Sequence, residues 1–301
     1  MTRHLPADEV AIYLHRDGPF AIFPIPDGRA RIVADLGTAD PTGRPAPGLA
    51  EVQALIDRRA GGGFRAVDSV WLTHFRINER KVAHYGGGRV FVAGDAAHIH
   101  SPAGGQGMNT GIQDAINLAW KLAMVIRGAA APGLLASYSK ERSAVGETVL
   151  RNATLLTNMA TLSHPIARGA RDVALKRLLG LGAIQRRVAG TMSEIDIAYP
   201  DSPLSSGPTG GTRLAPARYD GSPPGAGSRP LFALYTADRT LGAQLVARYP
   251  ALLEPQPRSP PGRNAVLIVR PDGYVGYGSR GVDRDGAEAY LAALSDPAAV
   301  P

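Results

Sequence analysis

The chain has 301 residues, of which 44% are hydrophobic and 20% charged, with a net charge of +7. This hydrophobic content is typical of a packed protein and excludes disorder of the whole chain. The absence of cysteine excludes disulfides, thiolate catalysis and cysteine-bound metals, and it agrees with a cytoplasmic location.

The basic residues are spread along the chain and do not form a block, so we expect no nucleic-acid partner. No apolar run approaches the roughly 20 residues that cross a bilayer. The first ten residues, MTRHLPADEV, contain no apolar signal region. We therefore expect no membrane partner and no export.

The first predicted elements belong to a sheet. Residues 10–36 are apolar stretches interrupted by Asp17-Gly18 and Asp27-Gly28, which predicts an antiparallel meander with tight turns. A helix over about 49–59 and a second extended run over 67–77 follow. The short apolar run RVFVA at 89–93 predicts a strand that is buried on both faces.

Helices are predicted next. Apolar residues recur at helical spacing after Met108, and Gly128 supplies a stop. The repeated positions are Ile112, Ile116, Ala119, Leu122, Ala123 and Ile126. Residues 134 to about 190 continue as helices, with a break at Pro165 and weak points at Gly180 and Gly182.

The last third of the chain is predicted to form a small separate domain. Residues 200–230 are dense in Pro, Gly and Ser, which predicts a linker or loose surface wrap between domains at 1–199 and 231–301. The tail reads as a strand (231–235), a helix (240–247), a hairpin (265–278) and a helix (285–294). This order is typical of the later part of a thioredoxin-like domain. Because a redox role needs a Cys-x-x-Cys pair, we expect a structural or homodimer-forming role.

The segment 94–109 carries the chemistry. A strand that ends in Gly94-Asp95 delivers a carboxylate to the edge of a sheet, where ligand crevices form. An ionised Asp95 has only acceptors and suits the hydroxyls of a polyol. The alternative is an aspartate that caps the N-terminus of a helix.

The glycines that follow favour a flat ligand. Gly104, Gly105 and Gly107 let the backbone approach such a ligand without an intervening side chain. A helix that starts near Met108 and Asn109 offers free N–H groups, which stabilise negative charge. Pro102 would form a rigid wall. An ordinary capping loop is the alternative.

These motifs together resemble a known fingerprint. The run GDAAH at 94–98, Pro102, GGQGMNTG at 104–111 and NLAWKL at 117–122 resembles the second flavin fingerprint of the para-hydroxybenzoate-hydroxylase-like FAD-dependent aromatic hydroxylases. The phrase VRPDGY at 269–274 is similar to the Cys-free thioredoxin-like appendage of the phenol and polyketide hydroxylases in that family.

The resemblance implies an α+β fold, in which a partial FAD-binding domain with an antiparallel substrate-binding sheet precedes a small thioredoxin-like α/β domain. It implies FAD as the cofactor and NAD(P)H as the reductant. Oxygen from O2 would pass through a flavin C4a-hydroperoxide to an aromatic small-molecule substrate, lying over the sheet of 10–36 and 67–77. Asp95 would bind the ribityl hydroxyls, Pro102 would lie beside the ring, and the backbone at 107–109 would face its pyrimidine edge. The implied cofactor-binding residues are Gly94, Asp95, Pro102, Gly104, Gly105, Gln106, Gly107, Met108 and Asn109.

One departure from the family pattern is visible. A member opens with a strand, a G-x-G-x-x-G turn and a helix that receive the FAD pyrophosphate, and no such Rossmann βαβ opening is found here. We therefore expect an N-terminally truncated enzyme. The alternative is a catalytically inactive C-terminal fragment that acts as an interaction or dimerisation module.

Other side chains are weighed against plainer roles. His98 and His100 lack a third ligand at suitable spacing, so loop packing is favoured over a metal. Arg76 and Arg80 are expected to be solvated, with contact to an anionic flavin as the alternative. Trp120 is expected in the core. The sequence thus assigns no metal ligand and no catalytic side chain.

Overall fold

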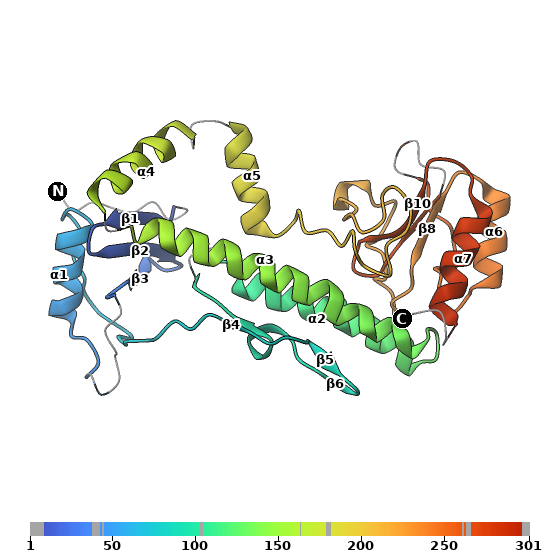
Figure 1. Ribbon diagram of the computed structural model, residues 1–301, viewed down its shortest axis with the longest axis horizontal. Helices are drawn as coiled ribbons and strands as arrows, with labels where there is room; N and C mark the ends of the chain where they lie inside the picture. Colours follow the sequence, from blue (N-terminus) through green and yellow to red (C-terminus); the bar gives the residue numbers. More distant parts are fainter. Residues whose placement is uncertain are drawn as a thin grey trace. The chain divides into compact units, whose positions relative to one another are not determined.

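The computed structural model describes residues 9–37, 43, 45–102, 105–162, 164–178, 182–260, 262 and 266–296. Helices and strands are mixed, as expected for an α+β fold (Figure 1). The chain divides into two compact units. The first contains Met1–Asn78 and Asn152–Ile184, and the second contains Glu79–Arg151 and Gln185–Pro301. These boundaries differ from a division at 199 and 231, because residues after Glu79 share a core with the tail.

The predicted meander is confirmed in the first unit. Strands β1 (Ala11–His15), β2 (Gly18–Ile25) and β3 (Arg29–Ala34) form an antiparallel sheet in the order β1-β2-β3 (Figure 1). The second turn has a positive φ at Asp27 (68°) and at Gly28 (71°), which suits the twist of a two-residue hairpin.

One face of this sheet is covered and the other is open. Helix α1 (Leu49–Arg59) lies at the predicted position, and its Ile56 packs with Phe20 and Ile22 of β2. Because side chains alternate along a strand, the neighbouring residues face the other way. Ile12 is 63% exposed and Phe23 is 37% exposed on that open face.

The extended run predicted over 67–77 is not a strand. No strand is assigned there, and Val70 and Trp71 are 76% and 73% exposed. Apolar and β-branched residues form a strand only when a neighbouring strand pairs with them, and none does so among the described residues. The sheet of the first unit is thus limited to β1–β3.

The helical segment is confirmed with small changes. Helices α3 (Ala136–Ala160), α4 (Pro165–Leu178) and α5 (Gly182–Ser193) follow a short 3-10 turn over Pro132–Leu135. Pro165 begins α4, a position that proline tolerates because its missing N–H has no helical partner. Gly180 lies outside the described residues.

The second unit starts with short strand pairs. Strand β4 (Arg80–Lys81) pairs with β7 (His98–Ile99), and β5 (Gly86–Gly87) pairs with β6 (Val90–Phe91). The predicted strand over 89–93 is therefore only two residues long. The prediction that this strand is buried on both faces is wrong, since Val90 is 70% exposed.

The fingerprint helix buries its polar face. Helix α2 (Gly107–Ile126) starts and stops as predicted, and Gly128 adopts a φ of +67°. The expected apolar stripe is half exposed, with Ile112 and Ile116 both at 51%. The buried face is formed instead by Thr110, Asp114, Asn117, Trp120, Lys121 and Met124. Charged partners on α3, which lies beside α2 (Figure 1), explain this burial.

The predicted elements of the tail are confirmed. Strands β8 (Ala233–Thr236), β9 (Val266–Val269) and β10 (Val275–Ser279) form an antiparallel sheet in the order β10-β9-β8. Helices α6 (Arg239–Arg248) and α7 (Arg284–Ser295) pack on one face together with the end of α2. Residue 265, at the expected start of the hairpin, lies outside the described residues.

The segment 200–230 is packed on the tail sheet and is not a free linker. Leu214 is 5% exposed and packs on the second face of the sheet. The N–H of Gly211 donates to the carbonyl of Val275 over 2.7 Å. Ser206 forms a bridge with Tyr277, and Arg213 with Tyr274. Both faces of the central strand β9 are therefore buried, which fits its continuous apolar run VLIV.

A buried ion network joins α2, α3 and the tail. Glu141 on α3 accepts hydrogen bonds from Lys121 Nζ at 2.8 Å and from Arg270 at 2.6 and 2.9 Å. Arg270 also contacts Asp272 at 2.6 Å, and the Trp120 Nε1–H donates to that carboxylate at 3.0 Å. Trp120 thus lies in the core, as predicted, with its polar edge satisfied.

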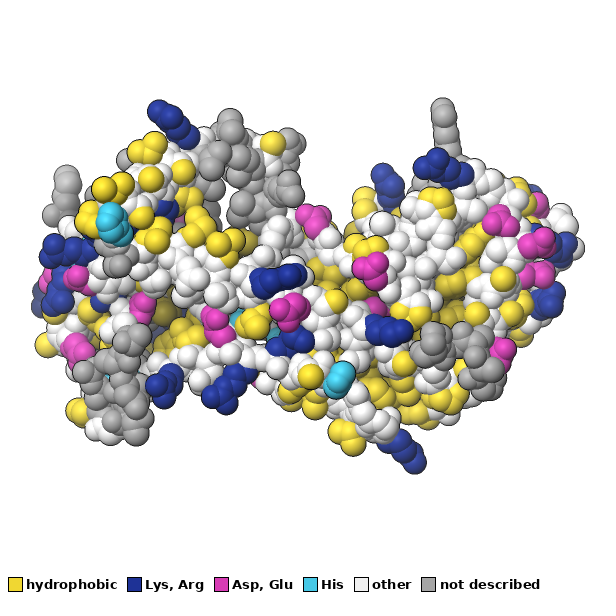
Figure 2. Space-filling model, in the orientation of Figure 1, with side chains coloured by type: hydrophobic (Ala, Val, Ile, Leu, Met, Phe, Trp, Pro, Cys, Tyr) yellow, Lys and Arg dark blue, Asp and Glu magenta, His cyan; other side chains and the backbone are white. Residues whose placement is uncertain are grey.

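The surface carries no concentrated basic stripe on the face drawn in Figure 2, where Lys and Arg side chains are scattered among hydrophobic and neutral ones. Arg76 and Arg80 are both exposed, as expected of solvated side chains. Within the described ranges, no helix is long and apolar enough to cross a membrane.

Candidate functional site

The turn that carries Asp95 is a single 3-10 turn over Gly94–Ala96, preceded by Ala93. The N-cap position is therefore taken by Ala93, so the alternative role of Asp95 as a helix cap is wrong. The side chain of Asp95 is exposed. The turn presents a carboxylate to solvent, as a polyol-binding aspartate requires.

This turn lies directly on the fingerprint helix. Gly94 has a φ of +57°, which strongly favours glycine. A Cβ on Gly111 of α2 would lie 3.2 Å from the Cα of Gly94. Glycine thus suits position 94 because of its φ, and glycine at position 111 allows the close approach of turn and helix.

Two described residues of the loop between β7 and α2 lie at the surface. Pro102 and Gly105 are exposed, and a Cβ on Gly105 would meet no atom within 4 Å. The N–H of Gly105 donates to the carbonyl of Pro102 over 2.9 Å. Gly104 lies outside the described residues. Among the described residues of this loop, no side chain fills the space above Gly105.

The start of α2 provides backbone donors. Gly107, Met108 and Asn109 form its first turn, in which N–H groups have no acceptor within the helix. The first helical bond runs from the Thr110 N–H to the Gln106 carbonyl over 2.9 Å. This turn contains no acidic residue, so the positive end of the helix dipole is not neutralised locally.

Gln106 differs from its neighbours. Its side chain is 3% exposed and donates to the carbonyl of Thr191 over 2.7 Å. Its amide is therefore engaged inside the protein, and only its backbone remains for a ligand. The prediction that Gln106 belongs to the cofactor-binding segment therefore concerns its backbone.

The buried carboxylate of Asp114 on α2 accepts a hydrogen bond from the turn. Asp114 Oδ2 accepts the Gly94 N–H at 3.0 Å and pairs with His98 Nε2 at 2.8 Å, and Oδ1 accepts Arg142 Nε at 2.6 Å. Burial alone would raise the pKa of Asp114, but His98, Arg142 and the Gly94 amide together lower it. Asp114 is thus held as a carboxylate.

The histidines do not form a metal site. His98 is 4% exposed and pairs with Asp114. Its ring is stacked with those of Tyr85 and His100, at centroid distances of 6.0 and 6.2 Å. No group of three or more metal-ligating side chains occurs in the part of the chain that the structure describes.

Two neighbours of the site were not singled out from the sequence. Arg142 and Glu194 gave no signal because both are remote along the chain from Gly94. Glu194 accepts hydrogen bonds from Thr110 and, at 3.1 Å, from Gln113 on α2. Burial raises the pKa of Glu194. This contact ties the end of α5 to the start of α2.

The lowered pKa values of Asp114 and Glu141 predict a loss of stability in acid. Burial opposes the shift at Glu141, but Arg270 and Lys121 outweigh it and lower its pKa from 4.5. A carboxylate with a lowered folded-state pKa stabilises the protein above its unfolded value, and this stability disappears as the pH falls. We expect the urea midpoint to fall steadily from about pH 5 to pH 3. Glu141→Gln should flatten that dependence, and an equally steep profile in the variant would contradict the assignment.

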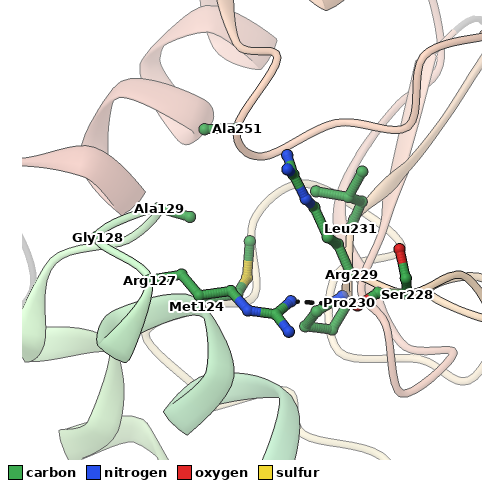
Figure 3. Close-up of a pocket in the computed structure, with 9 residues that line it drawn as sticks. All are labelled: Met124, Arg127, Gly128, Ala129, Ser228, Arg229, Pro230, Leu231 and Ala251. Carbon is green, nitrogen blue, oxygen red and sulfur yellow. Dashed lines mark hydrogen bonds between the residues drawn. The ribbon is translucent and has the colours of Figure 1, made fainter.

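A surface hollow of about 600 Å³ lies at the opposite end of α2 (Figure 3). It is lined by Met124, Arg127, Gly128, Ala129, Ser228, Arg229, Pro230, Leu231 and Ala251. The helix between this hollow and the glycine turn has 20 residues, a length of about 30 Å. The hollow is therefore separate from the glycine turn at the start of α2.

The residues present fit the pyrimidine and ribityl part of a flavin. An exposed carboxylate, unobstructed glycine backbone and the free amides of a helix start occur along one stretch of chain. Hydroxyls suit the carboxylate, and carbonyl oxygens suit the amides. Such an arrangement suits the binding of a partly planar, polar cofactor.

Comparison with known proteins agrees with this class. The family model described as FAD binding domain matches residues 1–153, and the chain belongs to this family. The chain is 41% identical over 196 residues to 6-methylpretetramide 4-monooxygenase of Streptomyces rimosus, covering 63% of this chain and 35% of that relative. The crystal structure of CabE, an aromatic hydroxylase from angucycline biosynthesis, has a TM-score of 0.74 at 32% identity, covering 95% of this chain and 60% of that one.

A third relative carries a different activity in its name. Dialkyldecalin synthase of Streptomyces rugosporus is 32% identical over 282 residues, which cover 91% of this chain and 56% of the relative. The chain therefore spans between about a third and three fifths of the length of these relatives. None of these comparisons supports the alternative of an inactive interaction module.

Proposed function

We propose that this chain contributes the flavin-ring and substrate part of an FAD-dependent monooxygenase that hydroxylates an aromatic, phenolic or polyketide compound. The observation that carries the proposal is the exposed carboxylate of Asp95 together with the unobstructed backbone at Gly105 and the start of α2, within a chain of the FAD binding domain family. The reaction consumes NAD(P)H, a proton and O2, places one oxygen atom on the ring, and releases NAD(P)⁺ and water.

FAD supplies the oxygen-transfer chemistry when it is bound, and the protein supplies position and electrostatics. Asp95 would accept hydrogen bonds from the ribityl hydroxyls. The first-turn amides of α2 would donate to the pyrimidine edge and stabilise negative charge there. Pro102, which is exposed, would provide a rigid wall beside the ring.

The open face of the β1–β3 sheet is the proposed substrate surface. Ile12 is opposite Ala21, and Ala21 is opposite Val33, so these three form an apolar row across the strands. Phe23 and Arg31 form the next pair of β2 and β3. A flat aromatic compound with an acidic hydroxyl suits an apolar row beside a guanidinium.

The name of one relative supports a second candidate function. The match to dialkyldecalin synthase covers more of this chain than the match to 6-methylpretetramide 4-monooxygenase. A reaction that forms a decalin ring system is therefore the second candidate. Incorporation of ¹⁸O from ¹⁸O2 into the product separates the two, because only hydroxylation adds oxygen.

Binding of FAD is the first test. We expect the protein to quench the fluorescence of FAD, and Asp95→Ala to weaken binding about tenfold to a hundredfold, because it removes hydrogen bonds to a charged acceptor worth roughly 1.5–3 kcal/mol each. Asp285→Ala, which removes an exposed carboxylate from α7, is the matched control and should leave the affinity unchanged. Equal affinities for Asp95→Ala and the unaltered chain would refute the assigned contact.

Turnover is the second test. With 6-methylpretetramide as the probe, we expect NAD(P)H oxidation and a product heavier by one oxygen atom. Formation of hydrogen peroxide alone, without an oxygenated product, would contradict the proposed substrate class.

The thioredoxin-like character of the tail and its role in a homodimer stay predictions. The packing of α6 and α7 on one face of a three-stranded sheet is compatible with them. Sedimentation analysis of the full chain tests the dimer.

A further inference from the structure

We propose that Asp114 is a positioning residue of the flavin site, because its buried carboxylate fixes the turn that presents Asp95. The inference rests on the proposed function, since it concerns the same site. Asp114 is fully buried, so it acts on a cofactor only through the groups that it holds.

The turn has few internal constraints of its own. The Ala97 N–H donates to the Gly94 carbonyl over 2.8 Å and closes the 3-10 turn. Among the described residues, no hydrogen bond holds the side chain of Asp95. The place of that side chain therefore depends on how firmly the backbone at Gly94 is anchored.

Asp114 supplies this anchor from the helix. Its Oδ2 accepts the Gly94 N–H at 3.0 Å, one peptide away from Asp95. Gly111 lies three residues before Asp114, on the same face of α2. The turn is thus fixed at two points, by a hydrogen bond to Asp114 and by backbone contact with Gly111.

The carboxylate is itself immobilised. Arg142 Nε donates to its Oδ1 at 2.6 Å, while the other guanidinium nitrogens donate to Tyr199 Oη at 2.9 Å and to the Thr110 carbonyl at 3.1 Å. His98 Nε2 pairs with Oδ2 at 2.8 Å. Three donors, from Gly94, His98 and Arg142, converge on this fully buried carboxylate, so its oxygen atoms have little freedom to move. The Gly94 amide, which donates to one of these oxygens, is therefore also held in place.

A double-mutant cycle tests the role, with FAD as the probe. Asp114→Asn should weaken FAD binding about tenfold to a hundredfold, the range found for groups that support the direct ligands of a metal. If Asp114 acts through Asp95, the loss should shrink or vanish in the Asp95→Ala background, because the contact it supports is already gone. Full additivity of the two losses, or an Asp114→Asn affinity within twofold of the unaltered chain, would overturn the proposal.

A second variant covers the risk that Asp114→Asn leaves Arg142 buried without its charge partner and fails to fold. Asp114→Leu combined with Arg142→Met removes both charges, a replacement that buried pairs often tolerate. It still deprives Gly94 of its acceptor, so FAD binding should fall as far or further. Glu141→Gln is the control, because it destabilises the same unit without touching the turn and should keep the affinity for FAD.

Hydrogen exchange of the Gly94 amide tests the positioning role of Asp114 without any cofactor. The amide should be protected in the unaltered chain and in Glu147→Gln, which changes an exposed carboxylate of α3, and it should lose at least tenfold of its protection in the Asp114 variants. Equal protection in all of them would overturn the positioning role. If the unaltered chain binds no FAD, the proposed function fails, and the amide measurement still decides whether Asp114 anchors the turn.

Discussion

Replacing Glu141 with glutamine is expected to lower the free energy of unfolding by about 3–5 kcal/mol, the cost of breaking a buried ion pair by removing one partner. Glu141 is 3% exposed, and Lys121 and Arg270 are fully buried beside it. Loss of the carboxylate leaves Lys121 without its charge partner, whereas Arg270 keeps Asp272 at 2.6 Å. Urea unfolding followed by circular dichroism measures the effect.

Two further variants identify the cause. Glu147→Gln changes an exposed carboxylate on the same helix, 3.9 Å from Lys81, and should cost less than about 1 kcal/mol. Lys121→Met in the Glu141→Gln background removes the unpaired ammonium and should recover part of the loss. Burial lowers the pKa of Lys121 to about 8, which agrees with a costly buried charge. An unchanged free energy of unfolding in Glu141→Gln would disprove this account.

Gly211→Ala is expected to destabilise the tail by about 3 kcal/mol or more. Gly211 has a φ of +79°, which costs an L-residue roughly 1–2 kcal/mol. A Cβ there would also overlap the carbonyl of Tyr199, a backbone group that cannot move aside. The hydrogen bonds of Gly211 with Val275 and Tyr199 would then be strained. Thermal unfolding of the variant checks the prediction.

Gly221→Ala provides the matched control. Gly221 also has a positive φ, of +92°, but a Cβ there meets nothing within 4 Å. Only the conformational cost of roughly 1–2 kcal/mol applies. The difference between the two variants therefore measures the close packing of Gly211 against the Tyr199 carbonyl. Equal losses would contradict that close packing.

Local patterns were reliable where a short stretch of chain determines the structure. The turns of the β1–β3 meander, the bounds of α1 and the start of α2 near Met108 all depend on neighbouring residues. The tail hairpin likewise turns at Pro271-Asp272-Gly273, where Gly273 adopts a φ of +82°. The resemblance of the Gly94–Leu122 run also placed the chain in the FAD binding domain family before its fold was known.

Burial was predicted less well, because it depends on distant partners. Apolar spacing indicated that Ile112 and Ile116 face the core, yet the structure buries Asp114 and Lys121 of the same helix. Those side chains form ion pairs with Arg142 and Glu141 of α3. The periodicity of residues within α2 contains no information about these partners. In the same way, the composition of residues 200–230 did not indicate that Leu214 covers a sheet.

The sequence by itself determined the local elements and the flavin fingerprint, since turn glycines, capping and helical spacing act between residues close along the chain. Only the tertiary structure decided which carboxylates are buried and which guanidinium group pairs with each of them. It also decided that the Gly94 N–H donates a hydrogen bond to Asp114, twenty residues later in the chain. The physical reason is that a buried charge is stable only where its partner lies, and that partner comes from another element of the fold.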